Sequence, residues 1–175
     1  VYDLYPLWAD GVDLQGGCIK IDAASQGIEA KNWTWAEKRP WCSGSGTKED
    51  PYVIGHDWIG DYKLNDLVID GNAVNSCISI LNSSAHFKIE DTTLFNSGNS
   101  HAGIYLYNST NGILFNNNCS ANNGHGIALV KSNKSILGDN IIRNNGMDGI
   151  LLDTCRDNLI SGNLLSDQST NIHKV

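Results

Sequence analysis

A repeat of 23 residues in the second half of the chain restricts the folds that it can adopt. Each unit opens on a glycine, an aliphatic residue, a variable residue and a leucine, and the openings are Gly103, Gly126 and Gly149. Each unit then runs to an apolar pair and an asparagine, at Asn117, Asn140 and Asn163. Short apolar strands at such a period are typical of solenoids, in which one unit cannot bury its apolar face alone. The repeat therefore predicts an all-β fold, a single-stranded right-handed parallel β-helix.

The alternation within each repeat indicates which side chains face inward. Residues two apart on a strand share a face, so we expect Ile104 and Leu106 to point inward, with their counterparts stacked on them. Neighbouring coils lie about 4.8 Å apart, so like residues stack on like. The asparagines fall at a matching turn, where we expect their amides to form a ladder that satisfies turn backbone. In the preceding coil, either Asp91 or Thr92 takes the asparagine's place.

The pattern divides the chain into two regions. Residues 1–49 are irregular, with one strand expected over Cys18–Asp22, and we predict that they form an N-terminal cap. Residues 50–175 carry the coils, and the 26 residues from Cys77 to Gly103 indicate about three extra residues around Ser97–Ser100. The last residues lack a polar capping element, so we expect further coils, or another subunit, to cover this edge.

Composition and charge exclude some classes of function. The 175 residues carry a formal net charge of −7 and no basic patch with interleaved aromatic residues, which argues against nucleic-acid binding. No apolar run is long enough to span a bilayer. The five cysteines show no CxxC spacing. A disulfide between Cys18 and Cys42 is one possibility, whereas we expect Cys77, Cys119 and Cys155 to be small buried hydrophobic residues.

The outward face of the Gly-Ile-x-Leu strands is the first candidate binding site. Outward positions of a soluble solenoid are usually polar, but the residues here are mostly apolar, namely Ser79, Tyr105, Ala128 and Leu151 in one column and Leu81, Tyr107, Val130 and Asp153 in the next. Such a stripe indicates a partner or second copy, a covering loop, or a glycan stacked on the tyrosines. Trp33 and Trp35 are further candidates for sugar stacking, although closing the end of the solenoid is the alternative role for this segment.

The corner before these strands is a candidate metal site. His101 and Met147 each lie two residues before a repeat glycine, and His125 and Asp148 lie immediately before theirs. Imidazole, carboxylate and thioether groups are ligands that copper or zinc uses. The alternative is that these are solvent-exposed corner residues that bind no ion.

A charged group flanking the same strands is the candidate for catalysis. A polysaccharide lyase or uronate epimerase needs a base, and cations or Ca²⁺ to neutralise the substrate acid, which Asp153 with Lys131 and Arg156 would supply. The group holds one carboxylate, whereas glycoside hydrolysis uses a pair. Surface salt bridges are the alternative account of these charges.

Two stretches resemble a known family. The segment Ser43–Ile54 and the Asn-rich coils from Asn108 to Asn163 are similar to NosD-like β-helix surface proteins, of the carbohydrate-binding and sugar-hydrolase type in the pectin-lyase-like superfamily. The resemblance implies a parallel β-helix in a protein exported from a prokaryotic cell, secreted or at the cell surface. The group includes lyases, epimerases, copper-site accessory proteins and many uncharacterised surface proteins.

The residues and the resemblance together favour a non-catalytic module that binds a glycan or a protein partner through Tyr105 and Tyr107. A lyase or epimerase is the first alternative and a metal-handling module is the second. We expect no resident cofactor, with Cu, Zn or Ca as the ions to consider.

Overall fold

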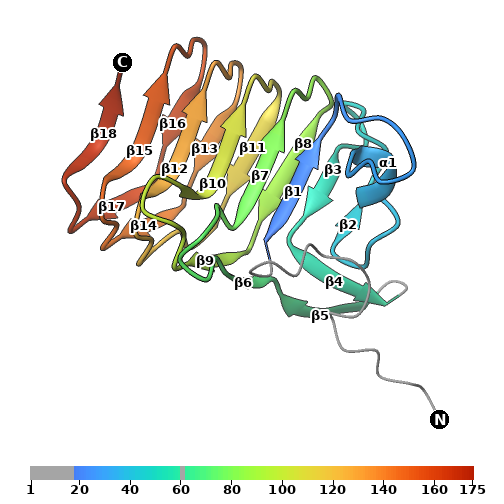
Figure 1. The fold of residues 1–175 in the computed structure, drawn as a ribbon, viewed down its shortest axis with the longest axis horizontal. Helices are drawn as coiled ribbons and strands as arrows, with labels where there is room; N and C mark the ends of the chain where they lie inside the picture. The colour runs from blue at the N-terminus through green and yellow to red at the C-terminus, as the bar shows by residue number, and fades with distance from the viewer. Residues whose placement is uncertain (1–17, 60–61) are drawn as a thin grey trace.

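The computed structural model describes residues 18–59 and 62–175, and the side chains of residues 56–66 lie outside this description. The chain winds into a parallel β-helix with three faces, so the predicted fold is confirmed (Figure 1). The predicted strand near residue 18 is observed as the first strand of the helix. Residues 1–17 of the predicted cap lie outside the described residues.

Six parallel strands form the first sheet, in the order β1 (Ile19–Asp22), β7 (Ile78–Leu81), β10 (Ala102–Tyr107), β12 (His125–Val130), β15 (Asp148–Asp153) and β18 (Thr170–Lys174). The second sheet runs in the order β2 (Cys42–Ser43), β3 (Tyr52–Ile54), β8 (Phe87–Glu90), β11 (Gly112–Phe115), β13 (Ile136–Gly138) and β16 (Leu159–Ser161). Within it only the β2–β3 pair is antiparallel.

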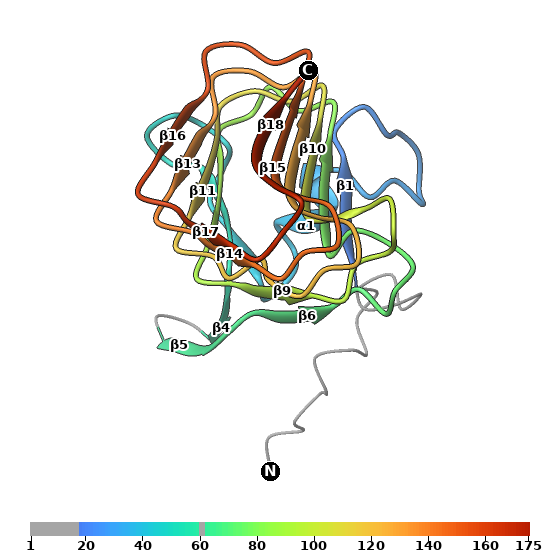
Figure 2. The same cartoon turned by 90° about the vertical axis from the view of Figure 1, so that its left-hand side faces the viewer.

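The third face is made of shorter strands, the parallel pairs β6 (Val68–Asp70) with β9 (Thr93–Phe95) and β14 (Ile141–Arg143) with β17 (Leu164–Ser166). Single bridges from Asn118 to Thr93 and to Ile141 connect the two pairs. Looking along the helix axis, Figure 2 shows the three faces around one interior. An antiparallel hairpin of β4 (His56–Ile59) and β5 (Tyr62–Asp66) lies outside them.

The register confirms the predicted stacking. Ile104 pairs with Ile127, and Ile127 pairs with Ile150. Ile78 pairs with Ile104, so the coil with three extra residues keeps the register of the core. The isoleucines of this column are fully buried, and burying one such side chain stabilises the fold by about 1.5–3 kcal/mol.

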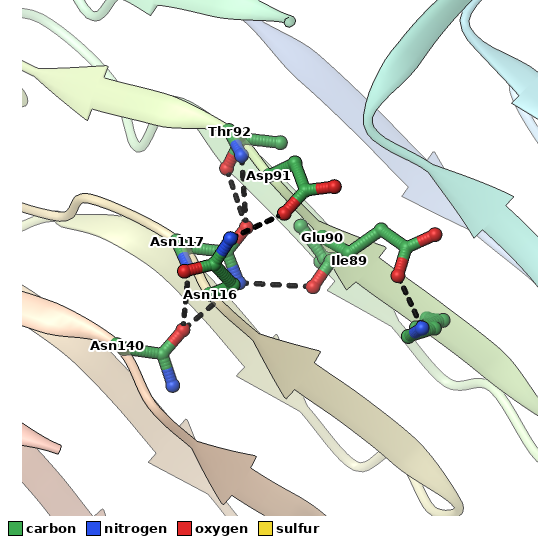
Figure 3. A network of polar contacts seen from close by, with 8 residues as sticks. Ile89, Glu90, Asp91, Thr92, Asn116, Asn117 and Asn140 are labelled. Carbon is green, nitrogen blue, oxygen red and sulfur yellow. Dashed lines mark hydrogen bonds and ion pairs between the residues drawn. The ribbon is translucent and has the colours of Figure 1, made fainter. Parts of the chain in front are cut away.

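The predicted asparagine ladder is present at the corner between the second sheet and the third face (Figure 3). The Nδ2 of Asn117 donates to Oδ1 of Asn140 at 3.0 Å and to the carbonyl of Ile89 at 2.9 Å. Thr92, not Asp91, precedes them in the ladder, because its hydroxyl donates to Oδ1 of Asn117 at 2.8 Å. Asp91 accepts instead from the neighbouring Asn116, as Figure 3 also shows.

The helix α1 (Trp33–Ala36) lies at the N-terminal end of the solenoid (Figure 1). Trp33 is 7% exposed, stacks on Tyr52 with ring centroids 4.4 Å apart, and donates from Nε1 to the hydroxyl of Ser83. It therefore packs into the cap and presents no ring face to a sugar, in contrast to the ligand-binding role considered from the sequence. Trp35 is half-buried, with the guanidinium of Arg39 4.7 Å from its ring centroid.

The cysteines, all in the described residues, form no disulfide, so the pair considered between Cys18 and Cys42 is not joined. Burial, with a smaller contribution from Glu37, raises the pKa of the Cys42 thiol to about 12. Cys77 and Cys119 are fully buried. Within residues 18–59 and 62–175, no helix is long and apolar enough to cross a membrane.

Candidate functional site

The outer face of the first sheet carries the predicted columns of side chains in register. Tyr105 lies between Ser79 and Ala128, and Tyr107 lies between Leu81 and Val130. The pairing extends both ends of the Tyr105 column beyond the predicted residues, to Lys20 on β1 and His173 on β18. We call this column, from Lys20 through Tyr105 to His173, the tyrosine column.

Two loops border this face at the corner that precedes its strands. Figure 2 shows the β6–β7 and β9–β10 connections projecting outward beyond the first sheet. The loops contact each other, because Gly98 donates from its amide to the carbonyl of Asn75 at 3.1 Å. A Cβ atom at Gly98 would lie 2.6 Å from the carbonyl oxygen of Val74, so only glycine allows this approach. The loop that holds the predicted extra residues thus borders the site, and its Ser100 lines one of the hollows described next.

Two adjacent hollows lie between the border loops and the tyrosine column, and we call them together the groove. Their volumes are about 340 and 330 Å³. They share Ser76, His101 and Tyr105 as common lining. The first is completed by Cys18, Lys20, Asn75, Ser79 and Leu81. The second is completed by Ser100, His125, Ala128, Val130 and Leu151.

The two predicted tyrosines form a platform beside the groove. Their ring centroids are 6.4 Å apart with an angle of 25° between the planes, so the two rings lie side by side and nearly parallel. Burial raises the pKa of the Tyr105 phenol, and Tyr107 and Asp153 contribute in the same direction, so this phenol remains a hydrogen-bond donor at neutral pH. The ammonium of Lys131 lies 5.7 Å from the Tyr107 ring centroid, within the range of a cation–π contact.

A cluster of His125, Asp148 and His173 adjoins the second hollow. Oδ2 of Asp148 lies 3.5 Å from Nδ1 of His125 and 3.1 Å from Nδ1 of His173. The amide of Asp148 also donates to Nδ1 of His125 at 3.3 Å, which leaves Nε2 to carry the proton of the neutral ring. Burial lowers the pKa of His125 although Asp148 opposes this shift, so His125 is neutral at pH 7.

Sequence reasoning did not include His173 in this cluster. The strand β18 pairs Ile172 with Ile150, a step of 22 residues where the previous step is 23. The one-residue change conceals the final coil from a search at fixed period. The signal in the sequence is an isolated isoleucine between polar residues, Asn171-Ile172-His173.

The four predicted metal ligands are not gathered into one set. His125 and Asp148 are in contact, His101 lines both hollows, and the Met147 side chain is 40% exposed. Within the described residues, no group of three or more His, Cys, Asp or Glu side chains is arranged to hold a metal ion. The Asp148 carboxylate instead lies at hydrogen-bonding distance from His173, and the Asp148 backbone amide donates to His125.

The predicted charged group does not form the surface salt bridges considered for it. Asp153 accepts a hydrogen bond from the hydroxyl of Thr154 at 2.7 Å. Among the side chains that the structure describes, no ion pair joins Asp153 to Lys131 or Arg156. Lys131 lies against Tyr107, and the Arg156 side chain is exposed. The three residues therefore form no common centre with the groove.

The arrangement is suited to binding. An aromatic platform, three serine hydroxyls, an amide and imidazole groups surround a groove open to solvent, and these groups stack on or hydrogen-bond to a polar ring.

Comparison with known proteins assigns the chain to a family. The family model described as periplasmic copper-binding protein (NosD) matches residues 19–174. No similar curated protein and no similar solved structure was found. The match runs from the first residue of β1 to the last residue of β18, and so includes every strand of the β-helix. The chain therefore belongs to the NosD family.

Proposed function

We propose that this chain is an exported, periplasmic β-helix module that binds a glycan in the groove on the outer face of its first sheet. The observation that carries the proposal is the stacked pair Tyr105 and Tyr107 at the edge of the groove. The family description supports the periplasmic location.

The energetics of the platform favour a sugar. The faces of a pyranose ring expose C–H groups that pack on an aromatic ring, while its hydroxyls need polar partners at the rim. The groove supplies both, because Ser76 and His101 line it beside Tyr105. The rings are held by the sheet and by each other, so binding immobilises few additional side chains.

The copper in the family description does not fit the side-chain donors of this structure. No described group of three or more His, Cys, Asp or Glu side chains is arranged for an ion, and the Asp148 carboxylate contacts both His125 and His173. We therefore assign no step of the function to a metal.

A comparison of two surface aromatic residues, the half-buried Tyr105 and the exposed Phe115, tests the proposal. Isothermal titration of the protein against a panel of soluble polysaccharides should show saturable binding of at least one. Tyr105→Ala should weaken it about tenfold, the factor that corresponds to 1.4 kcal/mol. Phe115→Ala is the matched control, because Phe115 is 39% exposed on the second sheet, away from the groove. Binding of none of the glycans, or equal losses in both variants, would contradict the proposal.

A further inference from the structure

We infer that the glycan bound in the groove is anionic, and that Lys20 receives its carboxylate or sulfate group. This inference rests on the proposed function and adds the chemical class of the ligand. The charge of the groove lining differs in sign from that of the chain as a whole.

Lys20 is the one lining residue with a full charge at neutral pH among the described residues of both hollows. The others are apolar, hydroxyl, amide, thiol or imidazole groups, and no described lining residue is a carboxylate. The whole chain carries a net charge of −7. The described lining of the groove therefore carries one positive charge and no negative one, in contrast to the acidic chain, and an anion is its complementary ligand.

The described carboxylates on the same face lie outside the lining of the groove, and their oxygens have polar partners. Asp22 accepts from Nδ2 of Asn82 at 3.0 Å and from the amide of Ala24 at 3.1 Å. Asp148 contacts His125 and His173, and Asp153 accepts from Thr154.

Lys20, in contrast, is exposed, and the ion pairs of the described residues do not include it. Its charge is therefore left for a ligand. A lysine binds an anion as a mobile point charge, so carboxylate and sulfate are both suitable.

The position of Lys20 suits a sugar chain that lies along the tyrosine column. Lys20 pairs with Ser79, which pairs with Tyr105, so the lysine is two strand spacings, about 10 Å, from the aromatic platform. One ring stacked on Tyr105 then leaves its neighbour in the chain to reach the ammonium. Ser79 lies between them and lines the same hollow, where it meets the hydroxyls of the sugar.

Glycans that differ only in charge test the inference. We would titrate the protein with oligogalacturonate and with its methyl ester, and with a sulfated galactan and its desulfated form. At least one acidic form should bind about tenfold more tightly than its neutral counterpart, and salt should weaken only the acidic form. Lys20→Gln should remove this difference and Lys20→Arg should retain it. Lys134→Gln, which makes the same change of charge at an exposed lysine outside the lining of the groove, is the control.

The outcomes separate this inference from the proposed function. Equal binding of acidic and neutral forms overturns the inference and leaves glycan binding intact. An equal effect of Lys20→Gln and Lys134→Gln does the same. A preference for the sulfated galactan alone supports the inference and identifies sulfate as the anion. If none of the four glycans binds while another glycan binds in a Tyr105-dependent manner, only the inference fails. If no glycan binds at all, both fail.

Discussion

At the scale of single residues, the corners of the solenoid require a left-handed backbone. The position after the strands of the first sheet has a positive φ in successive coils, at Asn82 (54°), Asn108 (48°), Lys131 (51°) and Thr154 (53°). Asparagine tolerates this region because its short amide bonds locally, and Nδ2 of Asn108 also donates to Oδ1 of Asn82 at 2.9 Å. A β-branched residue is strained there, so Thr154 is the unfavourable member of this column.

Thr154→Asn should therefore stabilise the protein by about 1 kcal/mol, because it relieves this strain. The free energy of unfolding in urea measures the effect. Lys131→Asn is the control at the same corner, and it should gain less because lysine is not β-branched. A Thr154→Asn protein no more stable than the parent would show that the hydrogen bond from Thr154 to Asp153 outweighs the strain.

At the scale of elements, the side-chain ladders hold the corners of successive coils together. Asn140 is fully buried, its Nδ2 donates to the carbonyl of Leu114 at 2.9 Å, and its Oδ1 accepts from the amide of Asn117 at 3.0 Å. The amide of Asn117 belongs to the turn that follows β11, and the carbonyl of Leu114 lies in the last part of that strand. The asparagine side chain therefore satisfies a turn amide on one coil and binds the strand that leads into that turn.

Asn140→Ala should destabilise the protein by about 2–4 kcal/mol, because it leaves two buried backbone groups without partners. Urea unfolding followed by far-UV circular dichroism measures the loss. Ser161→Ala, an exposed change on the neighbouring coil, should lie within about 0.5 kcal/mol of the parent. A loss for Asn140→Ala as small as this control would mean that water replaces the ladder at this corner.

The sequence predicted this ladder because three of its members are asparagines at one spacing. It did not predict the ladder at the corner between the first and second sheets, where Ser83, Ser109, Ser132 and Cys155 occupy equivalent positions. The serine hydroxyls and the Cys155 thiol accept hydrogen bonds from equivalent backbone amides. The ladder is therefore continuous although the residue types differ. The strand β18 was missed for a related reason. It keeps the strand pairing of the earlier coils, but its step of 22 residues departs from the 23-residue period of the sequence.

The candidate site was predictable in part. The alternation placed Tyr105, Tyr107 and Leu151 on one outward face, and the pairing confirms this placement. The groove was not predictable, because its walls come from the loops before β7 and β10, whose course no periodicity specifies. Lys20 was also missed, because its strand β1 pairs with β7, and the helix α1 and the strands β2 to β6 lie between them in the sequence.

At the scale of the molecule, cap and coils share one interior. A single cluster of buried residues runs from Trp33 and Trp41 of the cap to Leu152 of β15. Solenoid stability is a sum of coil stabilities and of the contacts between neighbours. A continuous core of this size couples the N-terminal segment to the coils. The first hollow of the groove lies where the two meet, between Lys20 and Tyr105.

Leu129→Ala tests this coupling, because Leu129 is fully buried between Leu106 and Leu152, far from the cap tryptophans in the stack. The cavity should cost about 2–5 kcal/mol. Tryptophan fluorescence reports mainly on the N-terminal region, and circular dichroism reports on the coils. The unfolding transitions that they follow should both move to lower urea by the same amount, because cap and coils unfold as one cooperative unit. Val130→Ala, half-exposed on the same strand, should shift both less. A fluorescence transition that stays in place while the dichroism transition moves would show that cap and coils unfold separately, and that the groove joins two independent units.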